Sequence, residues 1–303
     1  MERLVCMESS RVNRAFEDPV LLNDKRVLQN LLSAEDKYVP PACYFNCVQT
    51  DIRPFMRKMV SEWMAEVCTE QSTEEEVFPL AMNYLDRFLC VQNIHRTRLQ
   101  CLGAACMFLA SKLKENYHIS AEQLVMYTDS SISVSELREM ESTVLHVLKW
   151  DLSAITPNDF VAHIVHRLPL DPASVPNVKK HAQTFIALCA ADCKFMLYPP
   201  SMIAAGCIGA SIRGLALPCD SITDTLHQVT GIELECLRAC QESIEQIIRT
   251  SLRQFVNQSQ PESATIETPL KTNQPFMEQS TTPTDVRDIN LMAMDDENSL
   301  LSV

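Results

Sequence analysis

The segment LQCLGAACMFLASKL, residues 99–113, decides the fold class. It is apolar on nearly every side, and it carries the small residues Gly103, Ala104, Ala105 and Ala110. A helix of this composition needs other helices around it, and its small residues let those neighbours approach closely. The segment therefore predicts a buried helix at the centre of a helical bundle.

Helical patterns continue on both sides of this segment, because apolar residues recur there at helical spacing. Thr73 and Glu76 match the capping-box pattern of a helix start. The predicted set is a short helix followed by five more, at residues 24–34, 54–67, 73–89, 99–113, 120–127 and from Ser133 or Ser135 onwards.

The same order of helices recurs roughly one hundred residues further along the chain. In this second set, residues 201–214 again mix small and apolar side chains. The predicted helices begin near Thr156 and then cover residues 175–195, 201–214, 222–228 and 233–255. We therefore predict an all-α protein with two tandem five-helix domains. The first, with its preceding short helix, covers residues 23–152, and the second covers residues 153–256.

The two ends of the chain differ from these domains in composition. Residues 1–22 are mixed and polar, which predicts a flexible N-terminal tail. Residues 257–303 are dominated by Gln, Ser, Thr, Pro and Glu. Such a segment cannot bury enough apolar surface to offset the entropy lost on ordering. We expect a disordered C-terminal tail.

Composition disfavours several classes of protein. Only 6% of the 303 residues are aromatic and only 5 are Gly, which argues against a turn-rich β architecture. The net charge of −13 disfavours direct binding to nucleic acid. The longest strongly apolar run, residues 101–110, is too short to span a membrane. No phosphate-binding glycine loop or nucleophile elbow is present, so we predict neither a catalytic residue nor a cofactor.

The 13 cysteines include three pairs spaced four residues apart. This spacing places both thiols of a pair on one face of a helix. A zinc site is one interpretation, but no further Cys or His completes four ligands. We therefore expect no metal, and interpret these cysteines as small hydrophobic core residues with free thiols. The pairs are Cys43/Cys47, Cys189/Cys193 and Cys236/Cys240.

Several long stretches between residues 20 and 255 form recognisable motifs: MRKMV at 56–60 with Trp63, EEEVFPLAMNYLDRFL at 74–89, LASKLKE at 109–115, LKWDL at 148–152, KKHAQTF at 179–185 and YPPSMIA at 198–204. Together these stretches resemble the cyclin family, and specifically its D-type members. The resemblance implies two cyclin boxes and a non-catalytic, activating subunit of a cyclin-dependent kinase of the early cell cycle. It also implies that this kinase is directed to retinoblastoma-family proteins before DNA synthesis.

The resemblance assigns a kinase-binding role to Lys112, Lys114 and Glu141. They are expected to contact the mobile regulatory helix of the kinase, whose active position is needed for catalysis. Spacing alone supports an alternative to kinase binding, in which Lys112 only stabilises its own helix as a cation near the helix C-terminus.

A second expected surface is a shallow apolar groove formed by Met56, Arg57, Val60 and Trp63. This face resembles the site at which cyclins dock substrates and inhibitor proteins that carry an Arg-x-Leu element. A Trp beside a Met is a suitable anchor pocket. The alternative is ordinary core packing of an amphipathic helix, and Met59 and Met64 are expected to lie in the core.

Both tails carry short motifs. Leu4, Cys6 and Glu8 form the L-x-C-x-E pattern that binds retinoblastoma-family pocket proteins, in which an extended segment directs alternate residues to one side. The alternative is a chance match. Thr282 with Pro283 resembles the phosphorylation site that triggers nuclear export and destruction through a ubiquitin ligase. Localisation is therefore expected to alternate between nucleus and cytoplasm.

A different class of function has the same fold. Some general transcription factors also contain two cyclin boxes and bridge DNA to a polymerase. Such adaptors are expected to carry basic patches and often a zinc ribbon, whereas this chain is acidic and has no ribbon pattern. Copurification of a kinase, as opposed to retention on DNA at moderate salt, distinguishes the two.

Overall fold

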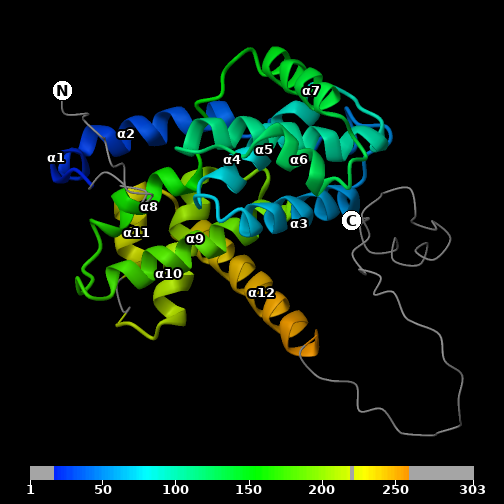
Figure 1. Ribbon diagram of the computed structural model, residues 1–303. Coiled ribbons are helices and arrows are strands. Elements are labelled where there is room, and N and C mark those ends of the chain that lie inside the picture. Colours follow the sequence, from blue (N-terminus) through cyan, green and yellow to red (C-terminus); the bar gives the residue numbers. More distant parts are fainter. Residues whose placement is uncertain (1–16, 219–221, 259–303) are drawn as a thin grey trace, which may run out of the picture.

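The computed structural model describes residues 17–218 and 222–258, and within these ranges all regular elements are helices (Figure 1). Side chains are described up to Arg253. The helices form two bundles with separate hydrophobic cores, which confirms the predicted all-α fold. Among the described helices, none has the length and apolarity that a bilayer-spanning segment requires.

The first bundle is built around the helix that the sequence predicts to be central. Residues 99–111 of α5 are buried except for Gln100, because α3, α4, α6 and α7 surround it. A Cβ added to Gly103 would lie 3.0 Å from Val60, so the glycine lets α3 pack closely. The bundle consists of α3 (Pro54–Glu70), α4 (Val77–Leu89), α5 (Leu99–Lys114), α6 (Ala121–Tyr127) and α7 (Val134–Val147).

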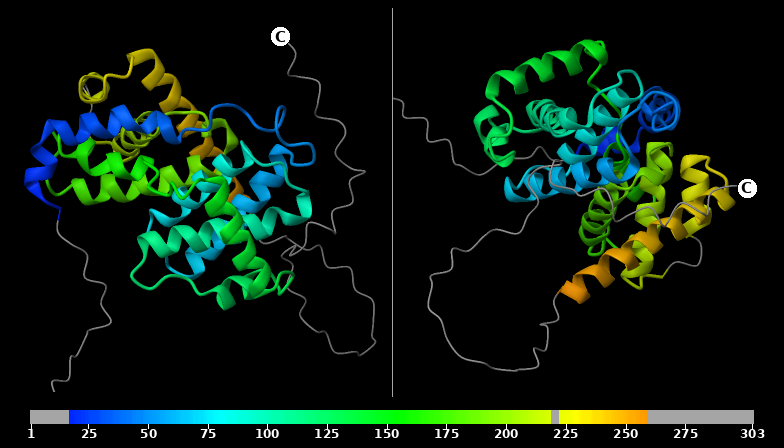
Figure 2. Two further views of the ribbon diagram at one scale, coloured as in Figure 1. Left: turned by 90° about the horizontal axis from the view of Figure 1, so that it is seen from above. Right: turned by 90° about the vertical axis from the view of Figure 1, so that its right-hand side faces the viewer.

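The second bundle repeats this arrangement around α10, which is again rich in small residues. A Cβ added to Gly206 would lie only 2.7 Å from Ile244 of α12, so this glycine allows α12 to pack closely. Beyond these contacts α12 extends away from the body of the protein (Figure 2). The bundle consists of α8 (Pro157–Val165), α9 (Val175–Ala191), α10 (Pro200–Gly214), α11 (Ile222–Thr230) and α12 (Leu234–Gln258).

Side-chain caps account for several helix starts. Ser133 caps α7 and forms a capping box with Glu136, which resolves the choice between Ser133 and Ser135. The predicted capping box of Thr73 and Glu76 is wrong. Helix α4 starts at Val77, and Glu76 forms an ion pair with Lys114 instead.

The helical segment that precedes the first bundle in the sequence packs on the second bundle. It comprises α1 (Pro19–Asn23) and α2 (Lys25–Ala34), followed by the 3₁₀ turn η1 (Glu35–Tyr38). Leu28 is buried in the second core, and α2 contacts α8. The buried Glu35 carboxylate accepts hydrogen bonds from the Ser201 backbone N–H and hydroxyl, both 2.7 Å long, at the start of α10. This segment therefore joins the two bundles.

Candidate functional site

An ion pair between α5 and α7 marks one candidate surface. Lys112 Nζ lies 2.6 Å from Glu141 Oε1. The Lys112 ammonium also sits 3.7 Å from the centroid of the Phe108 ring, which is a cation–π geometry. The Lys112 side chain stays 36% exposed and that of Glu141 15% exposed. The structure thus holds two of the predicted kinase-binding residues together, although they are far apart in the sequence.

Lys114 lies on the same helix but has a different partner. Its ammonium is 2.5 Å from the Glu76 carboxylate, which precedes α4. Burial opposes the charge of Lys114, but the hydrogen bond and charge of Glu76 outweigh this effect, so the pKa of Lys114 is raised. Leu113 and Tyr117 beside it expose large apolar side chains, 51% and 83% respectively. The end of α5 therefore presents fixed charges next to uncovered apolar surface.

The predicted groove on α3 is only partly present. Met56 and Val60 are buried in the first core, while Met59 and Trp63 remain partly exposed. Trp63 is fixed by a hydrogen bond of 3.1 Å from its indole N–H to the carbonyl of Tyr127. Of the four predicted groove residues, Trp63 alone keeps part of its side chain at the surface. The expectation that Met59 lies in the core holds only in part.

Arg57 does not line an exposed groove, and that prediction is wrong. Its side chain is 1% exposed and forms a two-pronged ion pair with Asp86 of α4, at 2.8 Å from Nε and 2.7 Å from Nη2. Tyr44 donates its hydroxyl to the same carboxylate at 2.8 Å. Burial opposes the charge of Arg57, but Asp86 more than compensates, and the pKa of Arg57 is raised.

The Arg57 guanidinium also joins the two bundles. It donates to the carbonyls of Ala191, at 2.8 Å, and Ala190, at 3.0 Å, at the end of α9. These carbonyls have no partner within their own helix, so Arg57 satisfies them. A signal for this role was present in the sequence: Asp86 is at helical spacing from the apolar residues Met82 and Leu89, and a buried carboxylate needs a cation.

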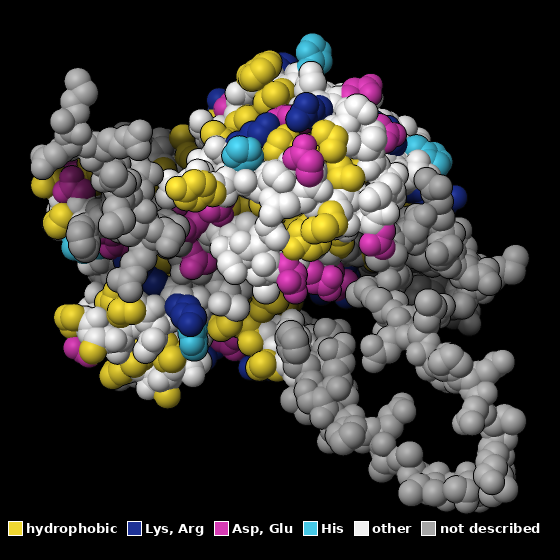
Figure 3. Space-filling view, in the orientation of Figure 1, with side chains coloured by type: hydrophobic (Ala, Val, Ile, Leu, Met, Phe, Trp, Pro, Cys, Tyr) yellow, Lys and Arg dark blue, Asp and Glu magenta, His cyan; other side chains and the backbone are white. Residues whose placement is uncertain are grey.

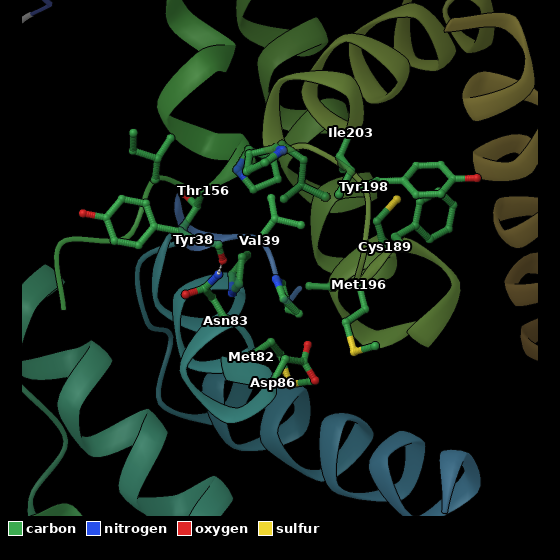
Figure 4. Close-up of a pocket in the computed structure, with 18 of the residues that line it drawn as sticks. Tyr38, Val39, Met82, Asn83, Asp86, Thr156, Cys189, Met196, Tyr198 and Ile203 are labelled. Atoms are coloured by element: carbon green, nitrogen blue, oxygen red, sulfur yellow. Dashed lines mark hydrogen bonds between the residues drawn. The ribbon is translucent and has the colours of Figure 1, made fainter. Parts of the chain in front are cut away.

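A small cavity of about 80 Å³ lies beside this junction, between the two bundles (Figure 4). Figure 4 shows Met82, Asn83 and Asp86 of α4 on one side and Tyr198 and Ile203 on the other. The lining is mostly apolar, and Asn83 donates to the Tyr38 carbonyl at 2.9 Å. Among the described residues no group of side chains is arranged to hold a metal ion.

Surface charge on the face seen in Figure 3 is mixed. Acidic and basic side chains are interspersed with hydrophobic ones across the visible described residues, without a continuous basic stripe on that face. The motifs at Leu4, Cys6, Glu8 and Thr282 lie outside the described residues.

Family comparisons add to this geometry. Residues 26–153 match the cyclin N-terminal domain, and residues 155–283 match the cyclin C-terminal domain. G1/S-specific cyclin-D2 of Gallus gallus is 55% identical over 295 residues, covering 95% of this chain and 99% of that protein. G1/S-specific cyclin-D3 of Homo sapiens is 51% identical over 294 residues, covering 96% and 100%. The chain belongs to the D-type cyclins.

A solved structure supports the same conclusion for the fold. The viral cyclin from herpesvirus saimiri superposes with a TM-score of 0.68 at 25% identity, covering 76% of this cyclin and all of the viral chain. As a member of its family, the cyclin is a regulatory subunit of a cyclin-dependent kinase and not itself a catalyst. The predicted family, fold class and kinase partner are confirmed.

Proposed function

We propose that this cyclin activates a cyclin-dependent kinase of the early cell cycle by binding its mobile regulatory helix at the surface around Lys112, Lys114 and Glu141. The Lys112–Glu141 pair beside exposed apolar side chains supports this proposal most directly. Fixed charges set the register of a docked helix, and apolar contacts supply binding energy. Relatives named G1/S-specific cyclins suggest the stage of the cell cycle.

The mechanism is a shift between two states of the kinase. The kinase needs its regulatory helix in the inward position, where a Glu of that helix pairs with the Lys of strand β3. A cyclin that binds only this state shifts the equilibrium towards it. Moving the ratio from 1:99 to 99:1 needs about 5.5 kcal/mol of differential binding. The decisive experiment mixes the purified chain with monomeric cyclin-dependent kinases and measures phosphorylation of a retinoblastoma-family tail.

Substrates and inhibitor proteins are proposed to dock at Trp63. Trp63→Ala is expected to weaken binding of Arg-x-Leu peptides by at least about tenfold, because large aromatic anchors dominate such interfaces. Fluorescence anisotropy with a labelled peptide measures the affinity. Trp150→Ala is the matched control, since Trp150 is 73% exposed and belongs to the segment that links α7 to α8. Equal affinities for the Trp63 variant and the unchanged chain would exclude this site.

The N-terminal motif is proposed to bind retinoblastoma-family pocket proteins directly. Glu8→Lys reverses the charge of its last residue and is expected to reduce this binding by at least about tenfold, because charge reversal at a contact costs both attraction and desolvation. Glu2→Lys makes the same charge change outside the motif and should bind normally. A pull-down with immobilised pocket protein in which Glu8→Lys binds like Glu2→Lys would contradict the assignment.

Turnover is proposed to depend on Thr282. Phosphorylation there adds a charge of about −1.5 to −2 and can create a docking site for a ubiquitin ligase after export from the nucleus to the cytoplasm. Thr282→Ala is expected to lengthen the half-life in cells several-fold and to increase nuclear retention. Pulse–chase measurement tests it against Thr281→Ala, which lacks the following proline. Indistinguishable half-lives for the two variants would refute it.

A further inference from the structure

Cysteine thiols gather where three segments of the chain meet. Tyr44 and Arg57 bind Asp86, and Arg57 also binds Ala191, so the loop at 39–53, the end of α4 and the end of α9 are held together. Each of these segments carries cysteine close to its contact with the junction: Cys43 and Cys47 in the loop, Cys90 just after α4, and Cys193 just after α9.

These cysteines are not simple core residues. Cys43 and Cys47 are exposed, and Cys90 and Cys193 are partly buried. The prediction that all paired cysteines pack in the core is therefore wrong for the loop pair, because this turn lies at the surface. It is also wrong for Cys236, which is exposed on α12.

Two of the thiols lie against the same turn. Cys90 Sγ is 3.7 Å from the carbonyl oxygen of Ala42. Cys47 Sγ is 3.3 Å from the carbonyl oxygen of Cys43, which follows Ala42 in the sequence. The Cys90 thiol is within electrostatic range of the Cys47 thiol and, with a smaller effect, of the Cys43 thiol. No helix spans residues 39–53, and the buried side chains of Tyr44, Phe45 and Ile52 anchor this segment in the first core, which leaves Cys47 at the surface. An exposed thiol is thus placed beside a half-buried one.

Among the remaining cysteines that the structure describes, none offers a comparable site. Cys189 Sγ and Cys207 Sγ are 3.8 Å apart, but both residues are buried in the second core. Cys236 is exposed, yet Cys240, one turn further along α12, is buried.

We propose that Cys47 and Cys90 form a site of reversible oxidation that reacts with hydroperoxides to give an intramolecular disulfide. In the first step the Cys47 sulfur attacks the O–O bond of hydrogen peroxide, which gives a sulfenic acid and water. In the second step the Cys90 sulfur loses its proton and attacks the sulfenic sulfur of Cys47; the S–S bond forms, the S–O bond breaks, and the oxygen leaves as a second water. The two thiols lose two electrons and the peroxide gains them.

The environment assigns the order of the two steps. Burial, together with the charges of Asp86 and Cys47, raises the pKa of Cys90 to about 12, so this residue stays a thiol and reacts second. Cys47 is exposed and can meet the oxidant first. The disulfide would tie the turn to the end of α4, next to the Asp86 carboxylate that organises the junction.

Peptide mapping of the full chain tests the proposal. The protein is treated with hydrogen peroxide, remaining thiols are alkylated, and the chain is digested with trypsin without reduction. The expected product links residues 38–57, which carry Cys43 and Cys47, to residues 88–96, which carry Cys90. Dithiothreitol should separate the two peptides, and dilution of the protein before oxidation should not reduce the yield.

Variants distinguish this link from other oxidation products. Cys47→Ser and Cys90→Ser should abolish the linked peptides, whereas Cys43→Ser and the exposed control Cys236→Ser should retain them. Circular dichroism is used to check that each variant folds. If a variant does not fold, the peptide map of the unmutated chain alone decides whether Cys47 and Cys90 are linked. The proposal is overturned if Cys47 and Cys90 are both recovered alkylated after peroxide, if Cys193 is the partner instead, or if the link joins two molecules.

Discussion

The Lys112→Glu variant is expected to fold like the unmutated cyclin and to activate its kinase at least tenfold to a hundredfold less well. The substitution replaces the Lys112–Glu141 ion pair by two carboxylates, and it removes the ammonium from the Phe108 ring. Losing one partner of a buried, hydrogen-bonded charge pair across an interface typically costs about 2–5 kcal/mol, and this is the cost expected for the proposed contact of Lys112 with the kinase helix; about 1.4 kcal/mol corresponds to a tenfold change. The loss is therefore a large part of the free energy needed to shift the kinase.

The fold is expected to tolerate this change. Lys112 is 36% exposed, and ion pairs of that kind contribute about 0–1 kcal/mol to stability. Kinase assays and thermal unfolding should be measured on the same preparation. Arg238→Glu makes an identical charge change on an exposed ion pair of α12 and should activate normally.

A charge-swapped double variant separates two explanations. Lys112→Glu combined with Glu141→Lys can restore the internal ion pair but presents reversed charges to the kinase. If the pair only holds α5 and α7 together, the double variant should regain activation. We expect it to remain inactive, because the proposed function has each of these two residues contact the kinase helix. A fully active Lys112→Glu single variant would remove the basis of the proposed function.

Arg57→Ala is expected to destabilise the protein by about 3–5 kcal/mol, because removing one partner of a buried ion pair leaves the other charge uncompensated. Asp86 would keep only the Tyr44 hydroxyl as a hydrogen-bond donor to its buried carboxylate. The carbonyls of Ala190 and Ala191 would lose the guanidinium as well. Since those carbonyls belong to the second bundle, the variant should also loosen the junction between the bundles.

Chemical denaturation of Arg57→Ala measures this effect. Lys58→Ala is the matched control: Lys58 is the next residue on α3, its ion pair with Glu62 is 3.8 Å long, and its side chain is 64% exposed. That variant should change stability by about 0–1 kcal/mol. Hydrogen exchange should show faster opening at the end of α9 in Arg57→Ala only. Similar stabilities of the two variants would contradict the role of Arg57 as the link between bundles.

Part of the candidate site could be predicted from the sequence. The resemblance to cyclins singled out Lys112 and Glu141, and the structure adds that they form one ion pair between α5 and α7. The groove assignment of Arg57 is wrong because the resemblance to cyclins assigns the groove to a helix face and does not indicate which of its side chains are buried. The position of Arg57 in the sequence predicts which face of α3 carries its side chain. Whether that face lies against solvent or against Asp86 depends on how α3 packs on α4, because Asp86 is 29 positions away in the sequence.

Helix positions and the two-domain pattern followed from the sequence alone, because apolar spacing and the Ser120 and Ser133 caps act over a few residues within one helix. Tertiary structure alone decided which elements meet. The sequence does not indicate that α2 packs on the second bundle or that Cys47 and Cys90 share a turn. Such contacts join residues distant in the chain, and the lowest free energy of packing the whole molecule selects them.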